Sequence, residues 1–547
     1  MVLSLGLSRS VRNVAALAGA IALCWCGEAL AQSGLNPGEM VLGSRRHGTV
    51  FGPVREVGTL SPVLSGRDLS VAAGAVRGVG PSLVAPHFAL VVLPGGRLIA
   101  CPSGGAAGRF EIDATTGDRT LLPNTNGPLW VGGGDMLAID ADSFLAIADD
   151  FAGGLRSNGR ILKHTISTGV TELVSGGTRG DGVVMLIPRS MTWIDSNTIA
   201  VVEFGPAGGV AGALVYRVDL QTGNRTVMTS LSRATAARYT VTNGVISTTS
   251  APVLPVGSGP TVERGDRGIM FLGGRLFAGG TAESIGGQFL GGIVEVDLAT
   301  GNRTLLGGTA FNGTTPITLP FGEGSDPYVS DAPSAFQKLT DHSFVFTETF
   351  GPDRVYSFDI NTRRVRVVAD LTPQVLPSLA PAFFSGLAVN PCGSATPGFV
   401  ISQQPQPAAA CLVLPAAVSV ALSTAGPFEY QWQAQRTDGT WVPLSNGQSA
   451  EFGIVSGAES GRLSISPPGP VSVRVRVEGA CGVLESTAAT VSNCLGDADC
   501  DSDTDGDDII TYFAAWDVSS PAADANRDGG VDGDDIIAFF GAWDAGC

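Results

Sequence analysis

The chain has 547 residues, of which 44% are hydrophobic, with 75 glycines and 33 prolines. This length exceeds that of one ordinary domain, and the many turn-forming residues favour mainly β architecture over helices. The formal net charge of -17 leaves no basic surface that could neutralise phosphates, so nucleic acid is excluded as an expected partner.

The N-terminal residues have the character of a targeting segment. Arg9 and Arg12 precede an apolar run at residues 14–24, and residues 29–31 form an A-x-A cleavage site. We therefore expect residues 1–31 to be a cleaved signal peptide and the mature chain to be secreted, extracellular or associated with a cell surface. An uncleaved anchor is the alternative, but it requires about 20 apolar residues. No later segment has that character, so we expect no transmembrane segment in the mature chain.

A strand–turn–strand phrase recurs five times after the signal peptide, each time behind a short apolar strand. The turns contain Thr-Gly at Gly117, Gly169, Gly223 and Gly301, with Arg363 in the fifth place. A repeated unit of few strands predicts a β-propeller, because each blade buries its faces against its neighbours. A β-sandwich is the alternative, but it would not require the same strand–turn–strand motif to occur five times. The hairpins occupy residues 109–122, 162–174, 216–228, 294–306 and 356–368.

A further blade can be completed by both ends of this region. The stretch at residues 48–64 would pair with the stretch at 383–394 and close the ring. We expect the propeller to span residues 35–395 with about six blades, although the long interval between Gly223 and Gly301 could hold an insertion or a degenerate blade.

The repeated units resemble bacterial propellers of the NHL and gluconolactonase-like kind, in the phrase D-x-x-T-G-x-R-T and in an acidic residue after the inner strand. The resemblance implies a fold and not an activity. In lactonase-like propellers, acidic residues at these places hold a divalent metal, whereas hydrogen bonding to loops or exposure to solvent is the commoner fate. The four histidines show no zinc-ligand spacing. The acidic residues are Asp149, Asp150, Glu203, Glu283 and Glu348.

Residues 397–493 consist of short alternating strands and resemble a bacterial immunoglobulin-like domain, with Trp432 as the core tryptophan. The usual inter-sheet cysteine positions are valine here, near Val420 and Val475. A bridge between Cys411 and Cys481 would link the same two sheets by another route, and we expect it because export permits disulfides.

The tail is an acidic tandem repeat with an offset of 27 residues. Residues 497–547 contain 14 aspartates, no glutamate and one basic residue, Arg527, and so carry 13 of the 17 excess negative charges. Clustered aspartates suit calcium, which takes about 6 to 8 oxygen ligands from positions 1, 3, 5, 7, 9 and 12 of a 12-residue loop. Both halves of the repeat place suitable residues at these positions.

We therefore predict two Ca²⁺ sites. The second loop has Gly529 at the sharp turn in sixth place, whereas the first has Ser502 there, which strains the backbone. We expect the second site to be the stronger. The ligands are Asp497, Asp499, Asp501, Asp503, Asp505 and Asp508 in the first loop, and Asp524, Asn526, Asp528, Gly530, Asp532 and Asp535 in the second.

An apolar stretch follows each loop with helical spacing. Ile509, Tyr512, Phe513 and Trp516 fall on one helical face, and the second repeat matches them. Two such faces can bury each other, although so small a domain needs metal or a covalent link. A disordered acidic tail is the alternative, but it would not require large apolar residues at matching positions of the two repeats.

Residues 494–547 resemble a type I dockerin, and more closely the variant that ends in Gly-Cys. The resemblance implies a bridge between Cys494 and Cys547, which leaves Cys500 as the odd thiol, and a cohesin-like or other cell-surface docking protein as partner. The familiar hydroxyl pair at positions 10 and 11 is replaced by Gly506-Asp507 and Gly533-Asp534. The partner therefore need not be a standard cohesin.

Three functions are compatible with this organisation. We expect a secreted binding or adhesion protein and not an enzyme, with the propeller as recognition head for a carbohydrate or protein ligand and the tail as calcium-dependent anchor. The alternatives are a dockerin-borne extracellular hydrolase or lactonase for a carbohydrate-derived substrate, and a structural cell-surface component. The ligand, the docking partner, the pairing of Cys101, Cys392 and Cys500 and the oligomeric state stay open.

Overall fold

The structure is a computed structural model in which part of the chain can be described. The predicted signal peptide at 1–31 and the side chain of Glu283 lie outside the described residues. So do Asp149, Asp150, Cys392, Ser502, Asp528 and Cys547. The structure describes residues 40–44, 49–51, 71–73, 79, 88–102, 108–113, 116–126, 134–148, 159–203, 213–231, 237–238, 240–246, 251–252, 256–262, 264–285, 288–312, 315–323, 325, 333–348, 354–370, 384–389, 399–412, 414–423, 428–501, 503–526 and 529–546.

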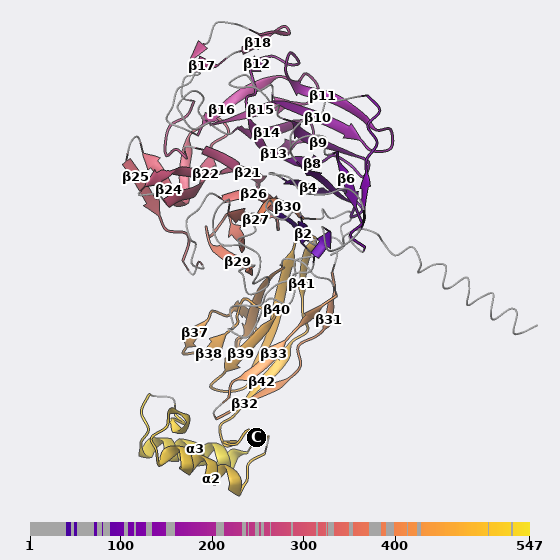
Figure 1. The fold of residues 1–547 in the computed structure, drawn as a ribbon. Coiled ribbons are helices and arrows are strands. Elements are labelled where there is room, and N and C mark those ends of the chain that lie inside the picture. Colours follow the sequence, from indigo (N-terminus) through magenta and orange to yellow (C-terminus); the bar gives the residue numbers. More distant parts are fainter. Residues whose placement is uncertain are drawn as a thin grey trace, which may run out of the picture.

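Six open antiparallel sheets of four or five strands are arranged around a centre in the described part before residue 390 (Figure 1). The first strand of each sheet contacts the first strands of two other sheets, in the cyclic order β4, β8, β13, β21, β26, β30 and back to β4. This arrangement is that of a β-propeller. The first strands are β4 (Phe88–Val92), β8 (Met136–Ala138), β13 (Pro188–Asp195), β21 (Arg264–Leu272), β26 (Pro333–Lys338) and β30 (Phe384–Val389).

The outer strands follow in chain order in every sheet except the one that contains β30. The longest interval between repeats, from Gly223 to Gly301, holds an insertion that contains β17 to β20; β17 pairs with β20, and β18 pairs with β19 and with β12 from the preceding interval. The strands are β5 (Leu98–Pro102), β6 (Phe110–Ile112), β7 (Arg119–Leu121), β9 (Ser143–Ala148), β10 (Arg160–Thr165), β11 (Val170–Gly176), β14 (Thr198–Glu203), β15 (Leu214–Asp219), β16 (Arg225–Ser230), β22 (Arg275–Ile285), β23 (Gln288–Val296), β24 (Arg303–Asn312), β25 (Thr315–Leu319), β27 (Ser343–Glu348), β28 (Arg354–Asp359), β29 (Val365–Asp370), and, in the small sheets, β12 (Gly182–Val183), β17 (Ala237–Arg238), β18 (Thr240–Thr242), β19 (Val245–Ile246) and β20 (Ala251–Pro252).

The two ends of the propeller region share one sheet. Its order is β3-β2-β1-β30, with β1 (Met40–Ser44), β2 (Thr49–Phe51) and β3 (Val71–Ala73). Strand β1 pairs antiparallel with β30 and places Leu42 opposite Leu387. The two ends therefore share a sheet as expected, but the strand next to β30 is β1 and not the predicted stretch at residues 48–64, whose strand β2 pairs with β1.

The repeated phrase builds the same turn in several sheets. Asp219 accepts hydrogen bonds from the backbone N–H and the hydroxyl of Thr222, both at 2.8 Å. These bonds lower the pKa of Asp219. Gly223 follows with a φ of +78°, and Arg363 takes the corresponding place in the fifth hairpin with a φ of +61°. The D-x-x-T-G phrase is thus a local turn in which glycine removes the cost of left-handed backbone.

The arginine that ends the phrase joins neighbouring sheets. Arg225 is buried, and its guanidinium donates to the carbonyl of Val183 at 2.6 Å, to the hydroxyl of Ser175 at 2.9 Å and to the carbonyl of Arg179 at 2.8 Å. Burial lowers the pKa of Arg225. Arg303 makes equivalent contacts one repeat later. The fifth hairpin has the buried Val365 at this position instead.

Residues after 399 form two sheets packed face to face below the propeller (Figure 1). Trp432 is fully buried between them, donates to the carbonyl of Ser460 at 2.8 Å and lies opposite Val475, so its predicted core position is correct. One sheet contains β32 (Ala408–Cys411), β42 (Ala489–Cys494), β40 (Val471–Gly479), β35 (Phe428–Gln435), β36 (Trp441–Pro443) and β41 (Gly482–Glu485); the other contains β33 (Ala416–Ser419), β39 (Arg462–Ser466), β38 (Gly453–Ser456) and β37 (Gly447–Ser449), and β31 (Ile401–Gln403) pairs with β34 (Ala421–Leu422).

Charged side chains join the propeller to this sandwich. Arg364 and Arg366, which flank Val365, both pair with Glu459 of the sandwich. His342 lies 2.9 Å from Asp359 through Nδ1 and 3.1 Å from Glu478 of the sandwich through Nε2. The fifth hairpin therefore departs from the repeated phrase where it meets the next domain.

The tail contains two helices, α2 (Gly506–Trp516) and α3 (Gly533–Ala545), with a short 3₁₀ helix η1 (Pro521–Ala523) between them. Tyr512 and Phe539 stack at 4.0 Å between ring centroids with an interplanar angle of 2°. The two apolar faces predicted from the sequence therefore meet. None of the helices in the described part of the chain has the length and apolar character needed to cross a membrane.

Candidate functional sites

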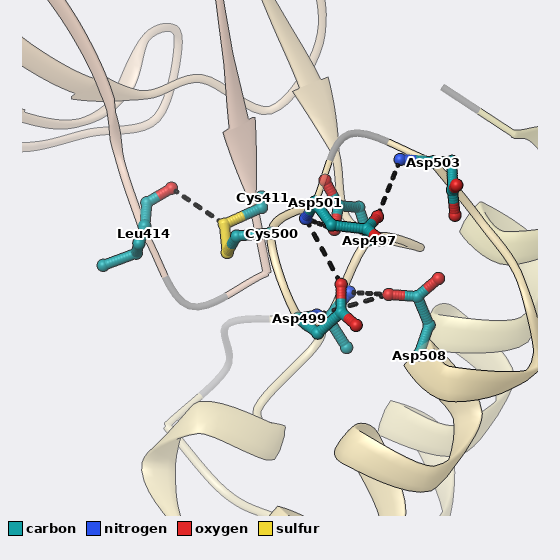
Figure 2. Close-up of a disulfide and its surroundings, with 9 residues drawn as sticks. Cys411, Leu414, Asp497, Asp499, Cys500, Asp501, Asp503 and Asp508 are labelled. Carbon is teal, nitrogen blue, oxygen red and sulfur yellow. Dashed lines mark hydrogen bonds between the residues drawn. A yellow bond between two sulfur atoms is a disulfide. The ribbon is translucent and has the colours of Figure 1, made fainter.

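The first tail loop gathers six carboxylates into two groups. The side-chain oxygens of Asp497, Asp499 and Asp501 lie within 4.8 Å of one another, and the same holds for a second group of three. Figure 2 shows the first group beside the sandwich. The second group consists of Asp503, Asp505 and Asp508.

The last ligand position of each loop also begins a helix. Asp508 is buried, and its Oδ1 accepts from the backbone N–H of Ala498 at 2.7 Å while its Oδ2 accepts from Asp505 at 2.8 Å. With Asp505 as N-cap, it forms a capping box at the start of α2. Asp535 does the same in the second loop, with Asp532 as N-cap of α3. One carboxylate thus fixes the loop and the helix together.

Repulsion between neighbouring carboxylates marks the first loop. Asp501 and Asp505 lie close enough to Asp503 to raise its pKa, and Asp501 is the largest cause. The pKa of Asp499 is also raised, first by desolvation and then by Asp501. Like charges held this close disfavour their ionised forms. A divalent cation bound among them would remove this repulsion.

The second loop has the geometry expected at its sharp turn. Gly529 has a φ of +91°, and its N–H donates to Oδ2 of Asp524 at 3.0 Å. Asn526 donates its backbone N–H to Asp535 at 3.1 Å. Asp528 lies outside the described residues, so the described part of this loop holds the remaining predicted ligands, including Gly530 and Asp532.

The disulfide prediction for Cys411 is wrong. Cys411 bonds Cys500, which the sequence analysis left as the odd thiol, and not Cys481. Strand β32 is parallel to β42 and ends beside Cys494 at the tail end of the sheet, whereas Cys481 lies in the hairpin at the opposite end. Cys481 and Cys494 are each disulfide-bonded. Cys547, the expected partner of Cys494, lies outside the described residues.

The two tail repeats also exchange hydrogen bonds. Trp543 of α3 donates its indole N–H to the carbonyl of Asp505 in the first loop at 2.9 Å. Trp516 of α2 donates to the carbonyl of Asp532 in the second loop at 3.4 Å. Each helix therefore holds the loop of the other repeat, so the two loops depend on each other for their shape.

The propeller contains a second set of candidate residues. Glu203 and Glu348 are the last residues of β14 and β27, each paired with the first residue of its sheet, Pro188 or Pro333. Both glutamates are buried. Because they occupy the same register position in two sheets of one ring, they lie at the same end of the propeller.

A buried tyrosine on the next strand accompanies each glutamate. Tyr356 donates its hydroxyl to Oε2 of Glu348 at 3.2 Å. Burial, followed by the charge of Glu348, raises the pKa of Tyr356, so the phenol stays protonated and donates. Tyr216 occupies the equivalent position beside Glu203. The sequence analysis missed both tyrosines, although the aligned phrases that begin with Tyr216 and Tyr356 carried the signal.

Two other polar residues in the propeller are parts of its packing. His164 is buried, its Nδ1 lies 3.0 Å from the hydroxyl of Thr171, and burial lowers its pKa to about 4. Arg109 donates to the same hydroxyl at 3.1 Å. Cys101 is also buried. The contacts of His164 and Arg109 are therefore made within the propeller, and Cys101 is the penultimate residue of β5.

No protein-family model matches this chain, and no curated protein matches it. An α-L-arabinanase from Penicillium chrysogenum is similar in structure, with a TM-score of 0.32 and 10% identity over 51% of this chain and 80% of that one. An α-L-arabinofuranosidase from Fusarium graminearum has a TM-score of 0.30 and 8% identity over 51% and 79%. A gluconolactonase from Xanthomonas campestris has a TM-score of 0.28 and 13% identity over 58% and 85%.

These similarities correct two expectations from the sequence. We expected a binding or adhesion protein whose propeller is a recognition head, and we expected no enzymatic activity. The three similar structures are all enzymes by their names. The expectation of a non-enzymatic recognition head is at variance with these names, and we do not retain it.

Proposed function

We propose that this protein is an exported hydrolase or lactonase that acts on a carbohydrate-derived substrate at the propeller end that holds Glu203 and Glu348. The supporting observation is the placement of these two buried carboxylates at equivalent positions of two blades. The blade between them has Gly280 at the equivalent position and so contributes no side chain there. We propose that the propeller has about six blades and spans residues 35–395.

The two carboxylates would divide the chemistry between them. Glycoside hydrolysis typically needs one carboxyl group to protonate the leaving oxygen and a second to activate water or attack the sugar. Glu348 receives a hydrogen bond from Tyr356, which fixes the orientation of its carboxylate. In a lactonase, the same two carboxylates would instead hold a divalent metal that polarises the lactone carbonyl.

Substitution of either glutamate tests this proposal. Full-length Glu203→Gln and Glu348→Gln variants would be assayed on aryl glycosides and aldonolactones alongside the wild type. We expect each to lose activity by about 10²-fold or more. Glu172→Gln, at an exposed position on β11, is the matched control and keeps full activity. Unchanged turnover in both variants, or no turnover of the panel by the wild type, would contradict the proposal.

The metal dependence of the same reaction separates the two chemistries. Dialysis against a chelator should abolish lactone hydrolysis if the glutamates hold a catalytic metal. Glycoside hydrolysis by a carboxylate pair should survive the same treatment. The assay is read at a temperature where the propeller stays folded in both conditions, so that loss of the tail does not affect the result.

The tail supplies the second part of the proposal, which is attachment. We propose that residues 494–547 are a dockerin-like module that binds two Ca²⁺ ions and docks to a cohesin-like or other cell-surface protein, and that residues 397–493 are an immunoglobulin-like spacer. Ile510 and Ile537, at equivalent positions of α2 and α3, are 69% and 72% exposed. Two large apolar side chains in this exposed, repeated arrangement fit a docking surface.

Capture of a partner by the full chain tests attachment. The immobilised protein would be incubated with a cell-surface extract in calcium and in chelator, with an Ile510→Asp and Ile537→Asp variant beside it. We expect a partner that is retained only in calcium and only by the wild type. Equal retention in calcium and chelator, or by the variant, would contradict a calcium-dependent surface that contains these isoleucines.

A further inference from the structure

The disulfide of this structure lies inside the first calcium loop. Cys500 stands between the proposed ligands Asp499 and Asp501 and bonds Cys411, at the end of β32, 89 residues earlier in the chain. Figure 2 shows the bond beside the side chains of the loop. A covalent link between a ligand loop and the preceding domain constrains the shape of that loop.

Two further contacts hold the same loop on the sandwich. The backbone N–H of Leu412, next to Cys411, donates to the carbonyl of Asp497 at 3.1 Å. The side chain of Leu412 packs against the core of the tail. The second loop has Arg527 at the position that corresponds to Cys500, so it has no equivalent bond. The two loops therefore differ in their attachment to the sandwich.

The backbone at Cys500 is in a conformation that the free chain disfavours. Its φ is +67°, which is uncommon for a residue other than glycine. The carboxylate oxygens of Asp497, Asp499 and Asp501 also lie within 4.8 Å of one another, so like charges are crowded around Cys500. The loop is thus strained and highly charged before calcium binds, and the bond to Cys411 offsets part of the cost of holding it in this shape.

We propose that the bond between Cys411 and Cys500 is a redox control on the first calcium site. In the oxidised protein the bond holds the loop in its ligating shape; in the reduced protein the loop relaxes and its calcium affinity falls, while the second loop keeps its affinity. The inference rests on the proposed calcium binding of the tail.

The redox step needs an external dithiol. A thiolate of the dithiol attacks the sulfur of Cys500, which is partly exposed, and the thiol of Cys411 leaves. The second thiol of the dithiol then displaces Cys500. Two electrons and two protons pass to the protein, which gains two thiols, and the dithiol becomes a disulfide. Cys411 is nearly buried, so attack at its sulfur is blocked.

Calcium binding and reduction of the disulfide must weaken each other by the same factor. If reduction weakens calcium binding by a given factor, bound calcium makes reduction harder by that factor. A tenfold change in affinity corresponds to about 30 mV in the reduction potential of the bond. The potential therefore provides a second measurement that does not depend on calorimetry.

Calcium titration of the full-length protein tests the inference. Isothermal titration would compare the oxidised wild type, the dithiol-treated wild type and a Cys411→Ser and Cys500→Ser double variant, with and without dithiol. We expect two sites in the oxidised protein and a first site at least tenfold weaker in the treated protein and in the double variant. The double variant should not respond to dithiol, which separates this bond from the bonds of Cys481 and Cys494.

A second double variant, Cys411→Ser with Cys500→Gly, separates strain from misfolding. Glycine adopts the positive φ freely, so this variant should recover part of the affinity that the serine variant loses. Equal affinity of the first site in the oxidised wild type and the serine variant would overturn the inference. An equal fall at both sites would also overturn it, because the bond would then support the whole tail. If the oxidised wild type bound no calcium, the proposed calcium function would fail instead.

Discussion

The propeller and the tail are both built from repeats, but different interactions hold the repeats together. Neighbouring propeller sheets bury large side chains against each other, among them Phe277, Phe344 and Tyr356. Burial of one such side chain contributes about 1.5–3 kcal/mol. In the tail the fully buried aromatic pair is Tyr512 with Phe539, and the rest of the buried core is alanine. We expect a repeat with a large core to be stable without a ligand, and we expect the tail to depend on metal and a covalent link.

The difference also appears in how each repeat uses its charged residues. In the propeller, Arg225 and Arg303 are buried and donate to carbonyls of the neighbouring region. In the tail, the aspartates point into their own loops and repel one another. Charged groups that are hydrogen-bonded within the protein stabilise it in any buffer. Charged groups that need an external cation make the stability of the fold depend on the concentration of that cation.

The largest expected effect is loss of calcium binding, which should unfold the tail and leave the propeller unchanged. Asp535→Ala removes a proposed ligand and leaves the N–H groups of Asn526 and Asp532 without their acceptor. We expect at least a 100-fold loss of calcium affinity in the second loop and unfolding of the tail, with the propeller unchanged. Titration calorimetry and thermal unfolding of the full chain measure both. Asp544→Ala, at an exposed position beyond the loop, is the control.

A stability effect confined to the propeller should follow loss of its buried arginine. Arg225→Met leaves several buried carbonyls without a donor, and we expect a loss of about 3 kcal/mol in the free energy of unfolding. Arg217→Met, at an exposed position on β15, should change stability by less than about 0.5 kcal/mol. Chelator should change neither result. An equal effect of the two substitutions would contradict the role assigned to Arg225.

A smaller effect should distinguish the two tail repeats from each other. Trp543→Phe removes the hydrogen bond to Asp505 and should cost about 1 kcal/mol of tail stability. Trp516→Phe removes a longer bond, to Asp532, and should cost less. Chemical unfolding in calcium, followed by circular dichroism, measures both. We therefore expect the first loop to depend more on the tryptophan of the other repeat than the second loop does. A larger cost for Trp516→Phe than for Trp543→Phe would contradict this.

The smallest expected effect concerns the junction between the propeller and the sandwich. Burial disfavours a charged imidazole, but Glu478, Glu429 and Asp359 outweigh it and raise the pKa of His342 above its ordinary value of about 6.5. The raised pKa means that the contact stabilises fully below about pH 6.5 and is lost as pH rises through the folded value. The contribution is about 1 kcal/mol or less, because the pair is partly exposed.

Thermal unfolding between pH 6 and pH 8.5 measures this loss. His342→Asn should reduce the pH dependence and keep the hydrogen bond to Asp359, since Asn197 makes the corresponding bond to Asp219 at 3.1 Å. Burial also raises the pKa of Glu429. Protonation of Glu429 therefore adds stability at low pH that is lost as pH rises, as for His342. A variant with the wild-type pH dependence would show that another group controls it.

Local patterns carried most of the fold that the sequence predicted. The turn at Gly223 depends on Asp219 and Thr222, which are close in sequence, so the phrase alone is sufficient to identify the hairpin. The alternation of apolar residues around Trp432 placed that side chain in a core for the same reason. A sheet shared by the two ends of the propeller region was predictable because both ends were left without a sheet of their own, but the sequence placed the pairing at residues 48–64 and not at β1.

Features that depend on how domains meet were not predictable. Cys411 bonds Cys500 because the tail loop lies against the end of β32, and no spacing in the sequence records that contact. Arg364 and Arg366 lie where the sequence departs from the repeated motif, but the sequence does not identify Glu459 as their partner. Glu203 and Glu348 were visible as acidic residues, but their equivalence depends on strand register.

Calorimetric unfolding of the full chain in calcium and in chelator tests the central contrast most directly. The account predicts one transition that shifts to lower temperature or disappears in chelator, together with a propeller transition that stays in place. The Asp535→Ala variant assigns the first of these to the tail. Identical thermograms in the two buffers, or a propeller transition that moves with the tail, would contradict the account.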